Sequence, residues 1–262
     1  MEAIYTAVFF VTVIGVVCAL VLCIASKFMY VKTDERIASL EEILPAVNCG
    51  ACGYPGCSGY ASALLSGSVK TDLCTPGGND VLRKISAVLG IDAGSMEKKT
   101  AVVNCNGDSG AQKKKMEYRG IQSCEAAKSH YGGENSCAFG CLGYGDCKKV
   151  CPVSAICMKE NLARVINENC TGCGLCVKAC PVNIISIEKT NVPVIIACRN
   201  IEKGAVTRKK CSNGCIACSK CVKECPDGAI SMKENLAWID YEKCSGCQKC
   251  VNVCVTKCIL RK

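Results

Sequence analysis

The chain has 262 residues, and 28 of them are cysteine, a density that packing alone does not explain. Many cysteines are separated by only two or three residues, and neighbours this close are poor disulfide partners but suitable ligands of iron–sulfur clusters. The formal charge of +9 does not indicate nucleic-acid binding, because each cluster held by four thiolates adds about −2. Apolar residues other than cysteine are sparse, so we expect bound metal to supply much of the folding energy.

The first predicted element is a membrane span. Ala3 to Ala25 form an uncharged run of 23 residues, which is long enough to cross the hydrocarbon core. A secretory signal is the alternative, but the run lacks a basic start and a small-residue cleavage site. Lys27, Lys32 and Arg36 follow the run, so the positive-inside rule places the rest of the chain in the cytoplasm. We predict a single-pass protein of the cell inner (plasma) membrane that contacts lipid, with its soluble domains in a reducing compartment that suits clusters.

Four cysteines follow the span at a distinctive spacing, Cys49-x2-Cys52-x4-Cys57-x16-Cys74. Glycines stand between them at positions 50, 53 and 56, where they let backbone N–H groups approach cluster sulfurs. Four cysteines make one closed site, for which we predict a [4Fe–4S] cluster; zinc is the alternative, because this is not the ferredoxin spacing. The predicted domain covers residues 28–99, after an anchor at residues 1–27.

The rest of the chain repeats itself. Nine cysteines and the hexapeptide MKENLA recur 74 positions further on, and the cysteines from Cys124 to Cys180 correspond to those from Cys198 to Cys254. A fixed offset of this kind indicates a duplicated structural unit. We predict two tandem ferredoxin-like α+β modules, at residues 100–190 and 191–262. Each has a short strand (Leu162 to Ile166, Leu236 to Ile239) and very short helices after the cysteine triplets.

The second copy carries the two-cluster bacterial ferredoxin pattern, in which the fourth cysteine of each motif ligates the other cluster. Zinc sites leave longer gaps between cysteine pairs and do not need a triplet followed by Cys-Pro. The pattern therefore predicts two [4Fe–4S] clusters, one held by Cys215, Cys218, Cys221 and Cys254 and the other by Cys225, Cys244, Cys247 and Cys250.

The first copy departs from the pattern, because Tyr144 stands where the second copy has Cys218. We predict one cluster on Cys151, Cys170, Cys173 and Cys176, and another on Cys137, Cys141, Cys147 and Cys180, about five in all. Besides Cys18 and Cys23 in the predicted span, six cysteines are left over, and we interpret them as buried spare thiols: Cys105, Cys124, Cys157, Cys198, Cys211 and Cys258. A sixth cluster is the alternative, and Cys211 is a competitor of Cys218 as a ligand in the second copy.

No catalytic site is predicted, since the sequence has no P-loop, no dinucleotide-binding fingerprint and no acid–base constellation. We therefore expect the protein to transfer electrons. The basic runs Lys113–Lys115 and Arg208–Lys210 are either solvated loops or a docking surface for an acidic electron donor. The single histidine, His130, lies in a polar loop and is expected to be a surface residue.

One transmembrane helix, the C-x2-C-x4-C-x16-C domain and the tandem ferredoxin motifs together resemble the B subunit of the Rnf-type ion-translocating ferredoxin:NAD oxidoreductase. The resemblance spans the whole chain. It implies an electron-transfer subunit of a translocase, which takes electrons from soluble reduced ferredoxin and passes them through its clusters to other membrane and peripheral subunits. NAD is then the final acceptor, with export of Na⁺ or H⁺.

Two other interpretations remain. A polyferredoxin subunit of another membrane oxidoreductase would share the tandem motifs, but it would lack the Cys49–Cys74 domain. A membrane-tethered zinc or thiol scaffold would use the cysteines for structure or signalling, without electron flow.

Overall fold

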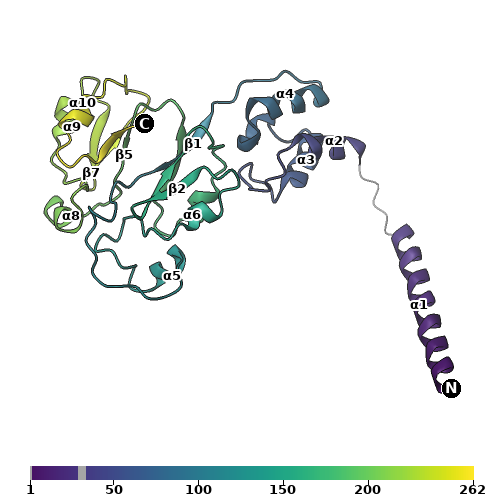
Figure 1. Cartoon of the computed structure of the whole chain (residues 1–262). Coiled ribbons are helices and arrows are strands. Elements are labelled where there is room, and N and C mark those ends of the chain that lie inside the picture. The colour runs from purple at the N-terminus through teal and green to yellow at the C-terminus, as the bar shows by residue number, and fades with distance from the viewer. Residues whose placement is uncertain (1, 29–33) are drawn as a thin grey trace. The chain divides into compact units, whose positions relative to one another are not determined.

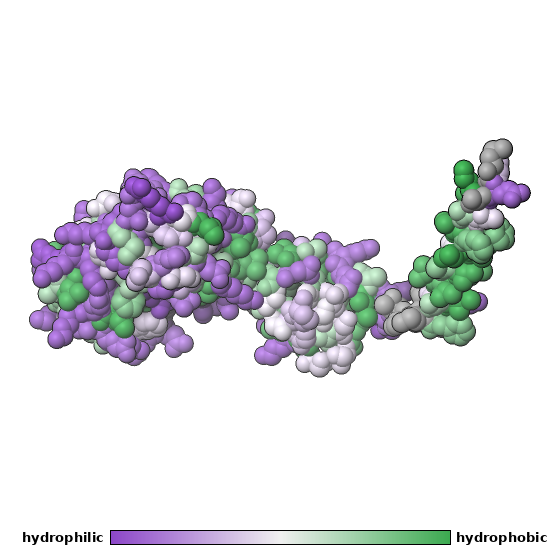
Figure 2. All heavy atoms as spheres, turned by 90° about the horizontal axis from the view of Figure 1, so that it is seen from below, coloured by the Kyte–Doolittle hydropathy of each residue, from purple (hydrophilic) through white to green (hydrophobic). Residues whose placement is uncertain are grey.

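The computed structural model describes residues 2–28 and 34–262. The chain divides into two compact units, residues 1–39 and 40–262. The first contains helix α1 (Glu2–Phe28), and among the described residues Ile4–Phe28 is the one helix long and apolar enough to cross a membrane. Its 25 residues rise by about 37 Å, which exceeds a hydrocarbon core of about 30 Å. Figure 2 shows hydrophobic side chains over its surface. Lys32, used above to orient the span, lies outside the described residues.

The Cys49–Cys74 region is helical. It contains α2 (Glu35–Ile43), α3 (Cys57–Leu65), η1 (Thr71–Leu73), η2 (Thr75–Gly77) and α4 (Gly78–Leu89). Its buried side chains include Leu40, Leu82 and Ile85, together with Tyr60 on α3. The hydroxyl of Tyr60 donates to the carbonyl oxygen of Lys70 at 2.9 Å. This hydrogen bond ties α3, which begins at Cys57, to the segment that leads to Cys74.

The remainder of the chain builds four two-stranded antiparallel sheets connected by very short helices (Figure 1). The first module contains β1 (Lys99–Val103), α5 (Cys124–Ser129), α6 (Asp146–Lys149), β2 (Ile156–Lys159), β3 (Leu162–Val165), α7 (Leu175–Lys178) and β4 (Ile185–Lys189). The second contains β5 (Val194–Ile196), α8 (Gly204–Lys210), α9 (Lys220–Glu224), β6 (Ile230–Lys233), β7 (Leu236–Ile239), α10 (Lys249–Val253) and β8 (Ile259–Arg261). Strands pair as β1–β4, β2–β3, β5–β8 and β6–β7.

The hairpins β2–β3 and β6–β7 show the duplication directly. Ile156 faces Val165 in the first, and Ile230 faces Ile239 in the second, in the same register. The two residues at each turn have positive φ, 51° and 58° at Glu160 and Asn161 and 46° and 62° at Glu234 and Asn235. Tight hairpin turns of this type require positive φ at both positions, and asparagine tolerates it. The short strands and helices expected from the sequence are thus present, with β3 ending one residue earlier than expected.

The other two sheets reveal an equivalence that the 74-residue offset hides. Val103 faces Ile185 in β1–β4, and Ile196 faces Ile259 in β5–β8. Ile185 and Ile259 are 74 residues apart, but Val103 and Ile196 are 93 residues apart, so the first module has a longer segment here, which includes α5. Cys105 and Cys198, each two residues beyond these strands, are therefore structural counterparts. The correspondence of Cys124 with Cys198, taken from the sequence offset, is corrected.

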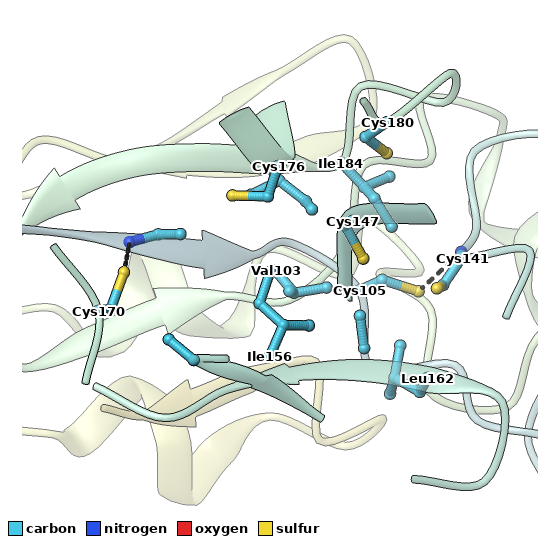
Figure 3. Close-up of a cluster of buried hydrophobic side chains, with 14 residues drawn as sticks. Val103, Cys105, Cys141, Cys147, Ile156, Leu162, Cys170, Cys176, Cys180 and Ile184 are labelled. Carbon is cyan, nitrogen blue, oxygen red and sulfur yellow. Dashed lines mark hydrogen bonds between the residues drawn. The ribbon is translucent and has the colours of Figure 1, made fainter. Parts of the chain in front are cut away.

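Each module has a small core of cysteines and aliphatic side chains. In the first, Ile156, Leu162 and Ile184 are at most 3% exposed and pack among the buried cysteines. Figure 3 shows the sulfurs of Cys141, Cys147 and Cys180 on one side of this core, while Cys170 and Cys176 lie on the other. The aliphatic core thus separates two groups of thiols.

The hydrogen bond of Tyr60 should stabilise the Cys49–Cys74 domain measurably. In a Tyr60→Phe variant the carbonyl of Lys70 loses its donor, and we expect a loss of about 1 kcal/mol, or amide exchange about fivefold faster in α3. Hydrogen–deuterium exchange of the full chain measures this. Tyr131→Phe, at a ring that is 85% exposed, is the control and should change nothing; equal exchange in all three proteins would contradict the assignment.

Candidate metal centres

The structure brings together the four cysteines of the first motif. Burial raises the pKa of the Cys74 thiol to about 11, and the neighbouring thiols of Cys57, Cys49 and Cys52 contribute in the same direction. The loop that carries Cys49 and Cys52 turns sharply, with φ of 65° at Gly50 and 87° at Gly53, a conformation that favours glycine. The backbone N–H of Cys57 donates to Asn48 Oδ1 at 2.8 Å, which fixes the start of α3 against this loop.

The structure also brings together two further groups of thiols, one in each module. Burial raises the pKa of Cys176 to about 11, with Cys173, Cys170 and Cys151 as its thiol neighbours. Burial likewise raises the pKa of Cys250, whose thiol neighbours are Cys244, Cys247 and Cys225.

Backbone N–H groups point at sulfurs of both groups. Ala155 donates to Cys151 Sγ at 3.2 Å, and Ala229 donates to Cys225 Sγ at 3.3 Å. These two hydrogen bonds are related by the repeat, and a third, from Ala101 to Cys170 Sγ, measures 3.3 Å. N–H donors of this kind stabilise the negative charge of a metal-bound thiolate.

The second module holds another predicted group. Burial raises the pKa of Cys221 to about 11, and its thiol neighbours are Cys215, Cys218 and Cys254. All four cysteines line one pocket together with aliphatic side chains such as Ile259. Cys218 and, in the other group, Cys247 are exposed, so both groups of this module reach the surface.

The altered motif of the first module gathers a different set from the one predicted. Burial raises the pKa of Cys147 to about 12, and its thiol neighbours include Cys141, Cys124 and Cys180. The same four cysteines line one pocket. Cys137, which the sequence analysis groups with Cys141, Cys147 and Cys180, does not line this pocket; Cys124, at the start of α5, lies there instead. Tyr144, where a ligand is missing from the motif, was the signal that another cysteine is needed.

Cys137 lies instead in a separate pocket. That pocket is also lined by Cys105, Cys198 and Cys211, three cysteines that the sequence pattern had indicated to be spare thiols. His130 is exposed, and its ring centroid lies 5.8 Å from that of Tyr118, as expected for a surface residue.

Cys157 lies outside these groups, whereas Cys258 lines the same pocket as the Cys221 group. Cys157 is exposed, and its thiol donates to the carbonyl oxygen of Arg164 at 3.7 Å. Cys258 is 2% exposed, and its sulfur lies 3.6 Å from Cys254 Sγ. The hydrogen bond from the Cys258 thiol lowers the pKa of Cys254 to about 5 and that of Cys215 to about 6. The ferredoxin pattern already supplies four ligands to this group, so we predict that Cys258 hydrogen-bonds to it and is not a ligand.

The donor sets fit iron–sulfur clusters. Each group offers four sulfur atoms, and the Cys221 and Cys147 groups each line one pocket. A [4Fe–4S] cubane takes one thiolate on each of its four irons, so the number and type of the donors match it.

Comparisons with known proteins agree with this chemistry. Residues 44–76 match a family model described as "Putative Fe-S cluster", residues 163–186 match a 4Fe-4S binding domain, and residues 214–259 match a 4Fe-4S dicluster domain. The chain is thus a ferredoxin-type iron–sulfur protein with an apolar N-terminal helix.

Three relatives define the family more closely. The chain is 40% identical to the B subunit of the Na(+)-translocating ferredoxin:NAD(+) oxidoreductase complex of Acetobacterium woodii, over 99% of this chain and 78% of the relative. It is 40% identical to the proton-translocating counterpart from Clostridium ljungdahlii, over 94% and 87%. It is 36% identical to the B subunit of the ion-translocating oxidoreductase complex of Methanosarcina acetivorans, over 94% of both. The chain belongs to this family of B subunits, as its resemblance to the Rnf type had indicated.

The group that contains Cys124 makes a specific prediction. Cys124→Ala removes one of four thiolates, so we expect the anaerobically purified chain to lose one cluster, about four irons and four sulfides. Iron and acid-labile sulfide analysis measures this, with Cys157→Ala, at an exposed thiol, as the control that keeps the full content. A full complement in Cys124→Ala would contradict the grouping.

Cys258 should behave as a donor and not as a ligand. We expect Cys258→Ala to keep the iron content of the wild type, whereas Cys254→Ala loses a cluster. Because hydrogen bonds to ligand sulfur help to set cluster potentials, one cluster of Cys258→Ala should become harder to reduce in an EPR-monitored redox titration. Iron loss equal to that of Cys254→Ala would show that Cys258 is a ligand.

Proposed function

We propose that this chain is the membrane-anchored electron-transfer subunit of an ion-translocating ferredoxin:NAD oxidoreductase. The observation that carries the proposal is the set of four-cysteine groups within one chain of this family. We propose five cluster sites in this chain, one in the first domain and two in each ferredoxin module. They are Cys49/Cys52/Cys57/Cys74, Cys151/Cys170/Cys173/Cys176, Cys124/Cys141/Cys147/Cys180, Cys215/Cys218/Cys221/Cys254 and Cys225/Cys244/Cys247/Cys250. A [4Fe–4S] cluster bound at each would accept and release single electrons.

Neighbouring cluster sites in this proposal lie close together in space. Lys178 Nζ donates to the carbonyl oxygen of Cys49 at 3.4 Å, and Lys178 stands at the end of α7, two residues after Cys176. The first-domain group therefore adjoins the Cys176 group. Within each module one short helix joins the two groups, since Cys176 and Cys180, like Cys250 and Cys254, belong to different groups a helical turn apart. Such a series suits electron transfer along the chain.

The electron donor that we propose is soluble reduced ferredoxin. The two basic runs lie side by side, because the backbone N–H of Lys113 donates to the carbonyl oxygen of Lys210 at 2.9 Å. Lys113, Arg208 and Lys209 are exposed. A joined cationic surface of this kind steers an acidic partner and accelerates its association.

The membrane partners are inferred from the anchor and the family. We assign residues 1–27 to the anchor, 28–99 to the first cluster domain, and 100–190 and 191–262 to two tandem α+β ferredoxin modules. Lys27, in the last turn of α1, supports a single-pass orientation with the soluble domains on the cytoplasmic side. There the chain contacts lipid and the other membrane and peripheral subunits of the complex.

Stopped-flow mixing of the detergent-solubilised full chain with reduced ferredoxin tests this function. We expect rapid loss of the clusters' visible absorbance as they are reduced, with a rate that falls as ionic strength rises. A Lys113→Glu/Arg208→Glu double variant should react at least about tenfold more slowly at low salt, whereas Lys84→Glu, at an exposed position on α4, should react like the wild type.

Two results would contradict the proposal. A chain that contains zinc without acid-labile sulfide would favour the scaffold interpretation. A chain that contains clusters but is not reduced by ferredoxin would favour a polyferredoxin of another oxidoreductase.

A further inference from the structure

A further pocket in the two modules is lined by four cysteines that belong to none of the five proposed groups. Cys105, Cys137, Cys198 and Cys211 all face it, and all four are less than 10% exposed. The pocket encloses about 300 Å³ of space free of protein atoms, close to the 350 and 330 Å³ of the two ferredoxin pockets described above. By donor set and size it matches those sites.

The four cysteines form two equivalent pairs, one from each module. Cys105 and Cys198 are counterparts by strand pairing, since each lies two residues beyond a strand that pairs in the same register. Cys137 and Cys211 are counterparts by the 74-residue repeat. Each module therefore contributes one cysteine after its first strand and one before its cysteine triplet, so the pocket has approximate internal symmetry.

Hydrogen bonds to the sulfurs repeat the symmetry. The backbone N–H of Cys141 donates to Cys105 Sγ at 3.5 Å, and its counterpart, that of Cys215, donates to Cys198 Sγ at 3.3 Å. The side chain of Asn200, which is 1% exposed, donates to Cys137 Sγ at 3.5 Å. Like the sulfurs of the other groups, these accept N–H donors, as thiolates bound to metal do.

The backbone supports the pocket from both modules. Gln112 and Cys211 form an antiparallel bridge, and the Asn213 side chain donates to the carbonyl oxygen of Asn106 at 2.8 Å. The backbone at Gly107 also lies close to the sulfur of Cys211, because a Cβ added at Gly107 would be 3.2 Å from Cys211 Sγ. The four sulfurs are thus held by segments on each side of the seam between the modules.

We infer that Cys105, Cys137, Cys198 and Cys211 bind a further [4Fe–4S] cluster at the seam between the two modules. The inference rests on the proposed function, in that the other groups take clusters of the same kind. Cys141 and Cys215, which donate to its sulfurs, are themselves members of the neighbouring groups. The new site therefore lies between one group of each module and joins the two series into one.

Native mass spectrometry of the anaerobically purified full chain, released from detergent, counts bound clusters and tests the inference. We expect six clusters in the wild type, with about 24 irons and 24 sulfides by chemical analysis. Cys105→Ala and Cys198→Ala, one from each module, should each carry five. Cys157→Ala, at the exposed thiol outside every group, is the matched control and should carry six.

Other outcomes separate the ways in which the inference can fail. Five clusters in the wild type and also five in Cys198→Ala would overturn this inference and leave the proposed function intact. Five clusters and one zinc ion would overturn it in favour of a zinc site, and six clusters in every variant would overturn the choice of ligands. A wild type without clusters would overturn the proposed function itself. The wild-type count decides even if a variant fails to fold.

Discussion

The bond between iron and buried cysteine sulfur is the interaction on which the rest of this structure depends. Burial raises the pKa of Cys147 to about 12 and that of Cys105 to about 12, so without metal these thiols stay neutral and offset little of the entropy lost in ordering the chain. Iron bound at the proposed sites would displace the protons and tie together residues as distant as Cys124 and Cys180. The modules have short strands, helices of four to seven residues and cores rich in cysteine, which is consistent with folding driven by metal binding.

The duplication does more than repeat one type of site, because the two modules form further features where they pack together. Each ferredoxin module is complete in its own hairpin and its own pair of groups, yet the segments before the triplets of both modules meet at a common seam. The basic runs join there through Lys113 and Lys210, and the four additional cysteines meet at the same seam. Packing two copies together thus creates a surface and a pocket that one module lacks, and the inferred cluster would make the electron path continuous between the modules.

The sequence predicts which thiols lie together where they are close in the chain, and it does not where they are distant. Spacings of two and three residues fix local geometry, so the thiols expected around Cys176, Cys221 and Cys250 do lie near one another in the structure. The position of Cys124 depends on the longer segment of the first module, which spacing does not describe. The 74-residue offset also misaligned Cys198, because its true counterpart, Cys105, is revealed only by strand register. The gap left by Tyr144 was the one available clue.

Hydrogen–deuterium exchange of the full chain, compared before and after anaerobic removal of iron by a chelator, tests most directly whether metal–sulfur bonds hold the fold together. We expect the four sheets, β1–β4, β2–β3, β5–β8 and β6–β7, to lose their protection together on iron removal, while α1 in its detergent micelle keeps its own. Protection of the four sheets that survives the removal of iron would contradict this expectation, and would mean that the aliphatic cores suffice to fold the modules.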